Sequence, residues 1–234
     1  MAFQEQLPRR QYTKKEMMKR VARFSKLKGF DGGLPDSYYA GAERTLYNVI
    51  GFQPPADESG GMQSPVGAQA ARMAAIKVTE GFNLGYCRAL PGQGPMMHNH
   101  DTNETFIAMT GVWRASWENT KGKVDYVDLQ PLDVISFPPG AIRRFENVTK
   151  GPKHKHSILM FVIGGDVPQA EFTAEAVAEL MRAEVLDEKM VLRLEAKRAS
   201  DKRMAEKLKG GSAKKASTKP IAKKATKKAA KKRA

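Results

Sequence analysis

Residues 92–111 read GQGPMMHNHDTNETFIAMTG, and this stretch holds two of the four histidines of the chain. His98 and His100 are separated by one residue, and side chains at positions i and i+2 of a β-strand lie on the same face. Glu104 follows four residues after His100, so a tight bend would bring its carboxylate to the same side. Two imidazoles and one carboxylate suit a divalent transition metal. These three residues are therefore the candidate metal ligands, for Fe, Mn, Ni or Zn.

The sequence around this stretch, from about 45 to 165, has the pattern of short β-strands. Apolar residues alternate with polar or small ones, or form short apolar runs, at 82–87, 112–117, 124–128, 134–137 and 158–163. Gly, Pro and Lys fill the intervening turns at 92–95, 121–123 and 138–140. Several short strands at regular spacing predict an all-β sandwich or barrel.

The histidine stretch resembles the first motif of the cupin superfamily, G-x5-HxH-x3-E-x6-G. Gly92, His98, His100, Glu104 and Gly111 occupy all five specified positions. The resemblance implies a double-stranded β-helix, which is a small jelly-roll-like barrel with a pocket at its centre. Proteins of this fold catalyse several reactions or only bind small molecules, so the resemblance does not name a reaction.

The second cupin motif, G-x5-PxG-x2-H-x3-N, is present in part. Pro138–Gly140 supplies the turn and Asn147 the final position. Leu132 stands where the family has its leading glycine, and Arg143 stands where metal-binding cupins have their last histidine ligand. A guanidinium stays protonated and has no free lone pair, so Arg143 cannot ligate a metal.

Three arrangements at Arg143 follow from this departure. In the first, the two histidines and Glu104 hold the metal, and Arg143 swings aside to bind a carboxylate or phenolate of the substrate. In the second, Arg143 pairs with Glu104 in a metal-free pocket. In the third, His154 or His156 supplies the missing ligand from the next strand.

The resemblance also places residues around the barrel pocket. By alignment, Arg143 and Phe145 face the pocket and Arg144 faces outward. Arg143 is the candidate catalytic residue and substrate clamp, and Phe106 and Phe145 are candidate substrate-binding walls that would serve equally well as core. We expect a small, anionic organic molecule as the ligand, and a metal-dependent oxygenase or a related lyase or isomerase as the enzyme class. The alternative is a metal-free binding or regulatory protein without catalysis.

The segments outside the barrel have different compositions. In residues 1–44 the sequence pattern predicts a basic N-terminal helix over 13–28, capped by Thr13 and Glu16, and a loop after it. In residues 166–209 the pattern predicts two helices. The first is capped by Thr173 and the second covers about 187–209. Residues 210–234 form a Lys- and Ala-rich tail that we expect to be disordered.

The net charge of +15 is concentrated at the two ends of the chain. Residues 210–234 carry +10 and residues 1–28 carry +7, which leaves the other 181 residues at −2. The tail is therefore a candidate for non-specific contact with nucleic acid. A single cysteine, a polar N-terminal stretch and the lack of a long apolar run predict a cytoplasmic protein without membrane contact. Exposed strand edges favour a homodimer.

Overall fold

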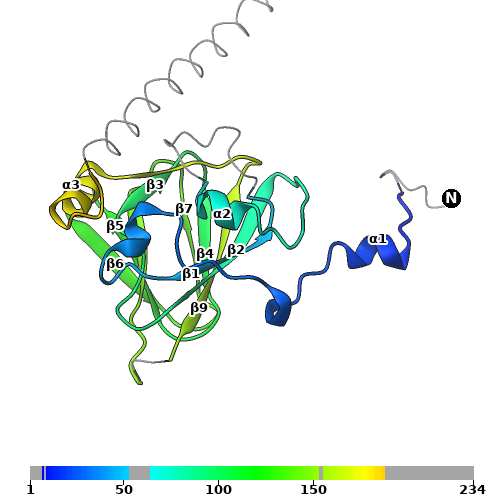
Figure 1. The fold of residues 1–234 in the computed structure, drawn as a ribbon, viewed down its shortest axis with the longest axis horizontal. Helices are drawn as coiled ribbons and strands as arrows, with labels where there is room; N and C mark the ends of the chain where they lie inside the picture. The colour runs from blue at the N-terminus through cyan, green and yellow to red at the C-terminus, as the bar shows by residue number, and fades with distance from the viewer. Residues whose placement is uncertain (1–6, 8, 53–63, 153–154, 188–234) are drawn as a thin grey trace, which may run out of the picture.

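The computed structural model describes residue 7 and residues 9–52, 64–152 and 155–187. Within these ranges most of the regular structure is β-strand, arranged as two five-stranded antiparallel sheets packed face to face (Figure 1). The predicted tail at 210–234 and nearly all of the second C-terminal helix at 187–209 lie outside the described residues.

Each sheet is built from strands that are distant in sequence. The first sheet has the order β1 (Thr45–Ile50), β2 (Phe82–Ala89), β9 (Ser157–Gly164), β4 (Glu104–Ala108) and β7 (Val134–Phe137). The second has the order β10 (Ala170–Phe172), β3 (His98–His100), β8 (Arg143–Asn147), β5 (Trp113–Glu118) and β6 (Val124–Leu129). Consecutive strands cross between the sheets at several points, as in a jelly roll. The prediction of an all-β, cupin-like double-stranded β-helix is confirmed.

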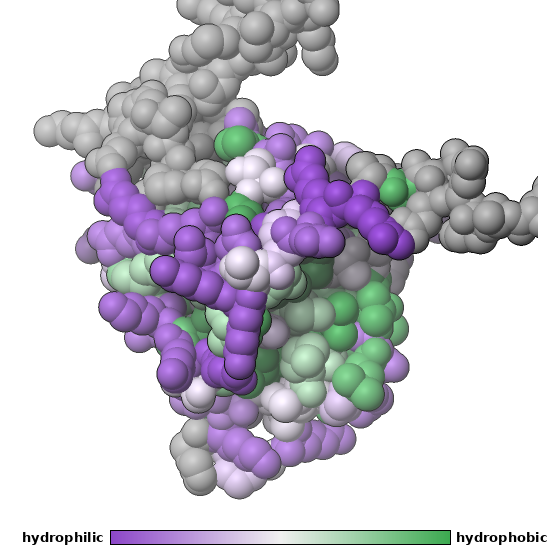
Figure 2. All heavy atoms as spheres, turned by 90° about the vertical axis from the view of Figure 1, so that its right-hand side faces the viewer, coloured by the Kyte–Doolittle hydropathy of each residue, from purple (hydrophilic) through white to green (hydrophobic). Residues whose placement is uncertain are grey.

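Burial alternates along the central strands, because successive side chains point to opposite faces of a sheet. In β9, Leu159, Phe161 and Ile163 are buried between the sheets. In β2 the small and polar residues face inward, so Cys87 is fully buried while Leu84 is half-buried on the outside. Figure 2 views the molecule from the right-hand side of Figure 1 and shows apolar side chains gathered on that face.

Aromatic residues from both sheets fill the core. Phe106 of β4 and Phe145 of β8 lie edge to face with ring centroids 4.8 Å apart, and the Trp113 ring lies 5.9 Å from Phe145. All three side chains are at most 5% exposed. Edge-to-face packing of this kind suits the charge distribution of aromatic rings. Two of the candidate pocket walls, Phe106 and Phe145, therefore form part of the packed interior.

The prediction of one N-terminal helix over 13–28 is wrong beyond its first turn and a half. Helix α1 spans only Lys14–Met18, and its capping box between Thr13 and Glu16 is present as expected. A separate 3-10 turn, η1, covers Phe24–Lys26. None of the α1 residues is buried, and a short helix without tertiary packing gains too little to propagate. Instead, Phe24 packs against Tyr47 and Tyr86 on the outside of the first sheet.

Two further 3-10 and α-helical turns cover one end of the barrel, η2 (Pro35–Tyr38) and α2 (Gly67–Ala71). The C-terminal helix α3 spans Ala174–Arg182 and begins at Thr173, whose side chain accepts a hydrogen bond from Ala176 N. Leu180 is fully buried, and Glu179 accepts a 2.8 Å hydrogen bond from the Tyr39 hydroxyl. No helix in the described part of the chain has both the length and the apolar character needed to cross a membrane.

Candidate metal centre

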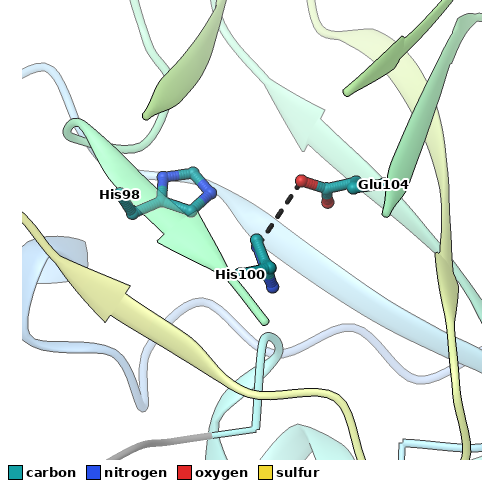
Figure 3. Close-up of side chains that lie close together, drawn as sticks. All are labelled: His98, His100 and Glu104. Atoms are coloured by element: carbon teal, nitrogen blue, oxygen red, sulfur yellow. Dashed lines mark ion pairs between the residues drawn. The ribbon is translucent and has the colours of Figure 1, made fainter. Parts of the chain in front are cut away.

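Two neighbouring elements bring the three candidate ligands together inside the barrel. The three-residue strand β3 turns His98 and His100 to the same face, and β4 begins at Glu104 after the bend at 101–103. One ligand atom from each residue lies within 4.8 Å of the other two. Figure 3 shows the Glu104 carboxylate directed toward the His100 ring, with His98 beside it on the same strand. All three residues are buried, with exposures of 3–8%.

The remaining residues of the two motifs hold the strands in place. Gly111 has a φ of 72°, and a Cβ there would lie about 2.1 Å from Ser157 Oγ, so only glycine fits this turn. Asn147 is fully buried, donates to Ala89 O at 2.9 Å and accepts from Thr149 N at 3.0 Å. These contacts give both residues a structural reason to occupy their positions.

His98 is held by the backbone. Its Nδ1 lies 2.8 Å from Met96 O, an acceptor, so Nδ1 carries the proton and donates. In the neutral ring this leaves the lone pair on Nε2 for a metal, which is the usual way that a second contact orients a histidine ligand. Burial and the nearby Arg143 charge lower the pKa of His98 to about 4, so the ring is neutral at pH 7.

His100 is held less firmly. Its Nε2 lies 3.4 Å from Glu104 Oε2, and its buried Nδ1 has no hydrogen bond of good geometry, although the backbone of Gln169 is close enough to influence the ring. Burial, followed by the charges of His98 and Arg143, lowers the pKa of His100 well below 6.5. A buried, neutral imidazole with an unpaired nitrogen is costly unless a partner such as a metal ion satisfies it.

Arg143 lies at the centre of the same cluster. It is the cross-strand partner of His98 between β3 and β8, and it is completely buried. Its Nε and Nη2 both donate to Glu104 Oε2, at 3.1 and 2.9 Å, and Nη1 donates to Ala141 O at 2.9 Å. Burial raises the pKa of Glu104 to about 7, and the guanidinium opposes that rise. The guanidinium is therefore the built-in counter-ion of the carboxylate.

These contacts bear on the three arrangements at Arg143. The pairing of Arg143 with Glu104, which belongs to the second arrangement, is the one observed. His156 is exposed and is influenced by Arg88 and Asp31, so it takes no part in the cluster. His154 lies outside the described residues. The donor set still fits a divalent ion, because two neutral imidazoles and a carboxylate converge, but one carboxylate oxygen is shared with Arg143.

The described side chains around this cluster are packed tightly, and Arg143 and Phe106 are both 0% exposed. Arg143, Phe106 and Phe145 face inward as expected, whereas Arg144 points outward with its side chain 38% exposed. A pocket of about 520 Å³ opens elsewhere, and its lining includes none of the three candidate ligands. Its lining includes Met96, Met97, Arg144 and residues of α3.

The sequence interpretation missed two charged residues that lie behind His98. Asp36 and Arg44 are 0% and 6% exposed and form an ion pair at 2.9 Å. Asp36 Oδ2 also accepts a hydrogen bond from Met96 N at 3.0 Å. Asp36 belongs to a loop rich in Gly, Pro and Asp, where an acidic residue is usually solvated, so the sequence carried no signal for its burial.

No family model and no curated protein matches the sequence. Solved structures match at low identity. Peruvianin-I, a cysteine peptidase from Thevetia peruviana latex, is 16% identical with a TM-score of 0.45, over 74% of this chain and 88% of that one. Vicilin from Corylus avellana (hazelnut) is 10% identical with a TM-score of 0.41, over 66% and 36%. Oxalate decarboxylase from Lactobacillus farciminis, solved as a formate complex, is 13% identical with a TM-score of 0.42, over 66% and 36%.

The chain spans about a third of the vicilin and oxalate decarboxylase chains. The strand order of the two sheets, together with the histidines and the glutamate of the first motif on β3 and β4, gives this chain the cupin-like fold that the sequence predicts.

Proposed function

We propose that this protein binds a divalent transition metal through His98, His100 and Glu104, and that a small anionic organic molecule is its ligand at that metal. The observation that carries the proposal is the convergence of three buried ligand atoms within 4.8 Å of one another. The reaction class we propose is that of a metal-dependent oxygenase or a related lyase or isomerase. Two histidines and a carboxylate form a ligand set that leaves coordination positions open for such chemistry.

The chain's own residues divide the work. The Met96 carbonyl fixes the His98 proton on Nδ1, so Nε2 is presented as a ligand. Glu104 supplies an anionic ligand, and its carboxylate is oriented by Arg143. When bound, the metal would act as a Lewis acid that polarises an oxygen of the ligand. Arg143 would then pair with the negative charge of that ligand while it remains beside Glu104.

Removing one imidazole at a time tests the metal site. We expect His98→Ala and His100→Ala each to abolish stoichiometric binding of Mn(II), Ni(II), Fe(II) or Zn(II) in untagged protein, because two ligands cannot replace three. His156→Ala is the matched control, since that histidine is exposed and outside the cluster. Elemental analysis and calorimetric titration give the readout. If the His98 variant keeps the metal and the His156 variant loses it, the assignment is wrong.

A second candidate is a metal-free binding protein without catalysis. The observation that favours it is the Arg143–Glu104 pair, which already neutralises the carboxylate that a metal would use. In that case, well-folded parent protein would take up none of these ions at millimolar concentration. A small anion would instead compete with Glu104 for the guanidinium.

A further inference from the structure

A chain of hydrogen bonds runs from the segment before the barrel to the candidate metal ligand His98. Arg44 Nη2 donates to Asp36 Oδ1 at 2.9 Å, and Arg44 Nη1 donates to Ala42 O at 2.7 Å. Asp36 Oδ2 accepts from Met96 N at 3.0 Å. Met96 O in turn accepts from His98 Nδ1 at 2.8 Å. Each atom in this chain has one clear role as donor or acceptor.

The burial of these groups is unusual for such a position. Asp36 is in η2, a four-residue 3-10 turn, and is fully buried, with Leu34 of the same segment in the hydrophobic core. Buried carboxylates are rare unless paired, and the Arg44 guanidinium supplies that pairing. A hydrophobic pair would fill the same space at less cost in desolvation. The charged pair therefore needs a reason beyond packing, and the bond to Met96 N provides one.

Both backbone polar groups of Met96 form hydrogen bonds. The carboxylate of Asp36 holds its N–H, and the ring of His98 is bonded to its carbonyl. Pro95 precedes it and has no N–H of its own to add to this network. The Asp36 contact thus restrains the backbone of Met96, and the Met96 carbonyl is the acceptor for the proton on His98 Nδ1.

We propose that Asp36 and Arg44 are positioning residues that fix the tautomer and orientation of His98 through the backbone of Met96. This positioning role rests on the proposed function, because it serves the proposed metal site. The tautomer of His98 is nevertheless a property of the metal-free protein and can be measured there. The hydrogen-bonded link from the pair to His98 runs through residue 96, although the two charges also act on the imidazole through space.

The isosteric change Asp36→Asn breaks the chain at one link. An asparagine has one carbonyl oxygen, and the cationic Arg44 will hold it, because hydrogen bonds to charged donors are the stronger ones. The amide NH2 then faces Met96 N–H, so that two donors meet and that bond is lost. Asp128→Asn is the matched control, since Asp128 also accepts from an arginine, Arg114, but on the exposed side of β5 and β6.

The first readout is the ¹⁵N spectrum of the imidazole rings in metal-free protein at pH 7.5. The parent should show His98 as the Nδ1–H tautomer, with His98→Ala used to assign its signals. Asp36→Asn should shift His98 toward a mixture of the two tautomers, and Asp128→Asn should leave it unchanged. A folded Asp36→Asn protein that keeps the pure Nδ1–H tautomer would overturn the proposal.

The second readout needs no variant. Met96 N–H should exchange with solvent slowly in the parent, because it is bonded to a buried carboxylate although its side chain is only partly buried. Exchange at the rate of an unprotected loop amide would overturn the proposal even if Asp36→Asn failed to fold.

The third readout is metal affinity by calorimetry with Ni(II) or Mn(II). Changes around a metal ligand commonly cost 10–100-fold, and we expect about a tenfold loss for Asp36→Asn. If Asp36→Asn shifts the His98 tautomer but the parent protein binds no metal, the proposed function is refuted and the positioning role stands. Metal binding that is equal in Asp36→Asn and parent, with an unchanged tautomer, would refute the positioning role alone.

Discussion

Arg143 donates two hydrogen bonds to a single oxygen of Glu104, from Nε at 3.1 Å and from Nη2 at 2.9 Å, with both side chains buried. The same oxygen lies 3.4 Å from His100 Nε2. One carboxylate oxygen is thus shared between a fixed internal cation and the candidate metal site. A metal ion bound at this site would therefore compete with the guanidinium for the negative charge of Glu104.

Replacing Arg143 with histidine should therefore strengthen metal binding. The change removes a fixed positive charge, frees Glu104 Oε2 and supplies an imidazole on the strand that faces His98. We expect the affinity for Mn(II) or Ni(II) to rise roughly 10–100-fold, the range of effects seen for changes around metal sites. Calorimetric titration measures it, and Arg144→His is the control because that side chain points outward. Equal or weaker binding in Arg143→His would show that Arg143 does not limit the site.

Removing the charge of Glu104 should destabilise the fold. Glu104→Gln leaves the buried guanidinium without its counter-ion, and breaking a buried ion pair in this way typically costs about 3–5 kcal/mol. The double variant Glu104→Gln/Arg143→Met should recover most of that loss, because no uncompensated charge remains. Asp128→Asn breaks an ion pair that is more than a third exposed and should cost about 1 kcal/mol or less. Urea unfolding at pH 8, where Glu104 is ionised, measures all three, and a Glu104→Gln cost as small as that of Asp128→Asn would contradict the pairing.

The backbone at Leu132 is strained, and we expect a glycine at this position to relieve the strain. It has a φ of 75°, it is 74% exposed, and it stands where the second cupin motif has glycine. A left-handed conformation costs a non-glycine residue roughly 1–2 kcal/mol, of which the entropy of a glycine in the unfolded chain gives back part. Leu132→Gly should therefore stabilise the protein by about 0.5–1 kcal/mol, while Leu132→Ala, which keeps the strain, should not. Thermal unfolding of the two variants separates these outcomes, and equal melting temperatures would argue against strain at this turn.

The stability of the metal-free protein should fall as the pH is lowered from 6.5 to 4.5. Burial lowers the pKa of His98 to about 4 and that of His100 well below 6.5, and it raises the pKa of Glu104 to about 7. In this window the unfolded chain binds two protons on these imidazoles that the folded protein lacks. The folded protein binds one proton on Glu104 that the unfolded chain lacks. The unfolded state therefore binds more protons in total, so lowering the pH through this window favours unfolding.

Urea unfolding between pH 4.5 and 6.5 in the presence of a chelator measures the slope of stability against pH. His98→Ala removes one of the two imidazoles, so its slope should be smaller than that of the parent over the same range. His156→Ala should keep the slope of the parent, since His156 is exposed. A parent protein whose stability rises on acidification would show that the two histidines are not buried in their neutral forms.

The sequence alone was sufficient to predict the fold and to name three residues that the structure brings together, His98, His100 and Glu104. Alternation in segments such as 82–87 and 158–163 reports burial on one face of a strand, which is a local property that residue order records. His98 and His100 share a face for the same local reason, and Gly111 marks a turn that no other residue fits. The N-terminal helix is shorter than predicted, because the apolar spacing of Met17 and Val21 does not show whether a surface lies opposite them, and both side chains are exposed.

Only the tertiary structure decided how the charges are paired. The Arg143–Glu104 contact joins residues 39 apart on different sheets, and the Asp36–Met96 contact joins residues 60 apart. Such pairings depend on which segments become neighbours and on which groups lose contact with water. The local sequence of one segment determines neither. Burial makes Arg143 and Asp36 structural partners of the candidate metal site, whereas the same residue types at the surface would be solvated.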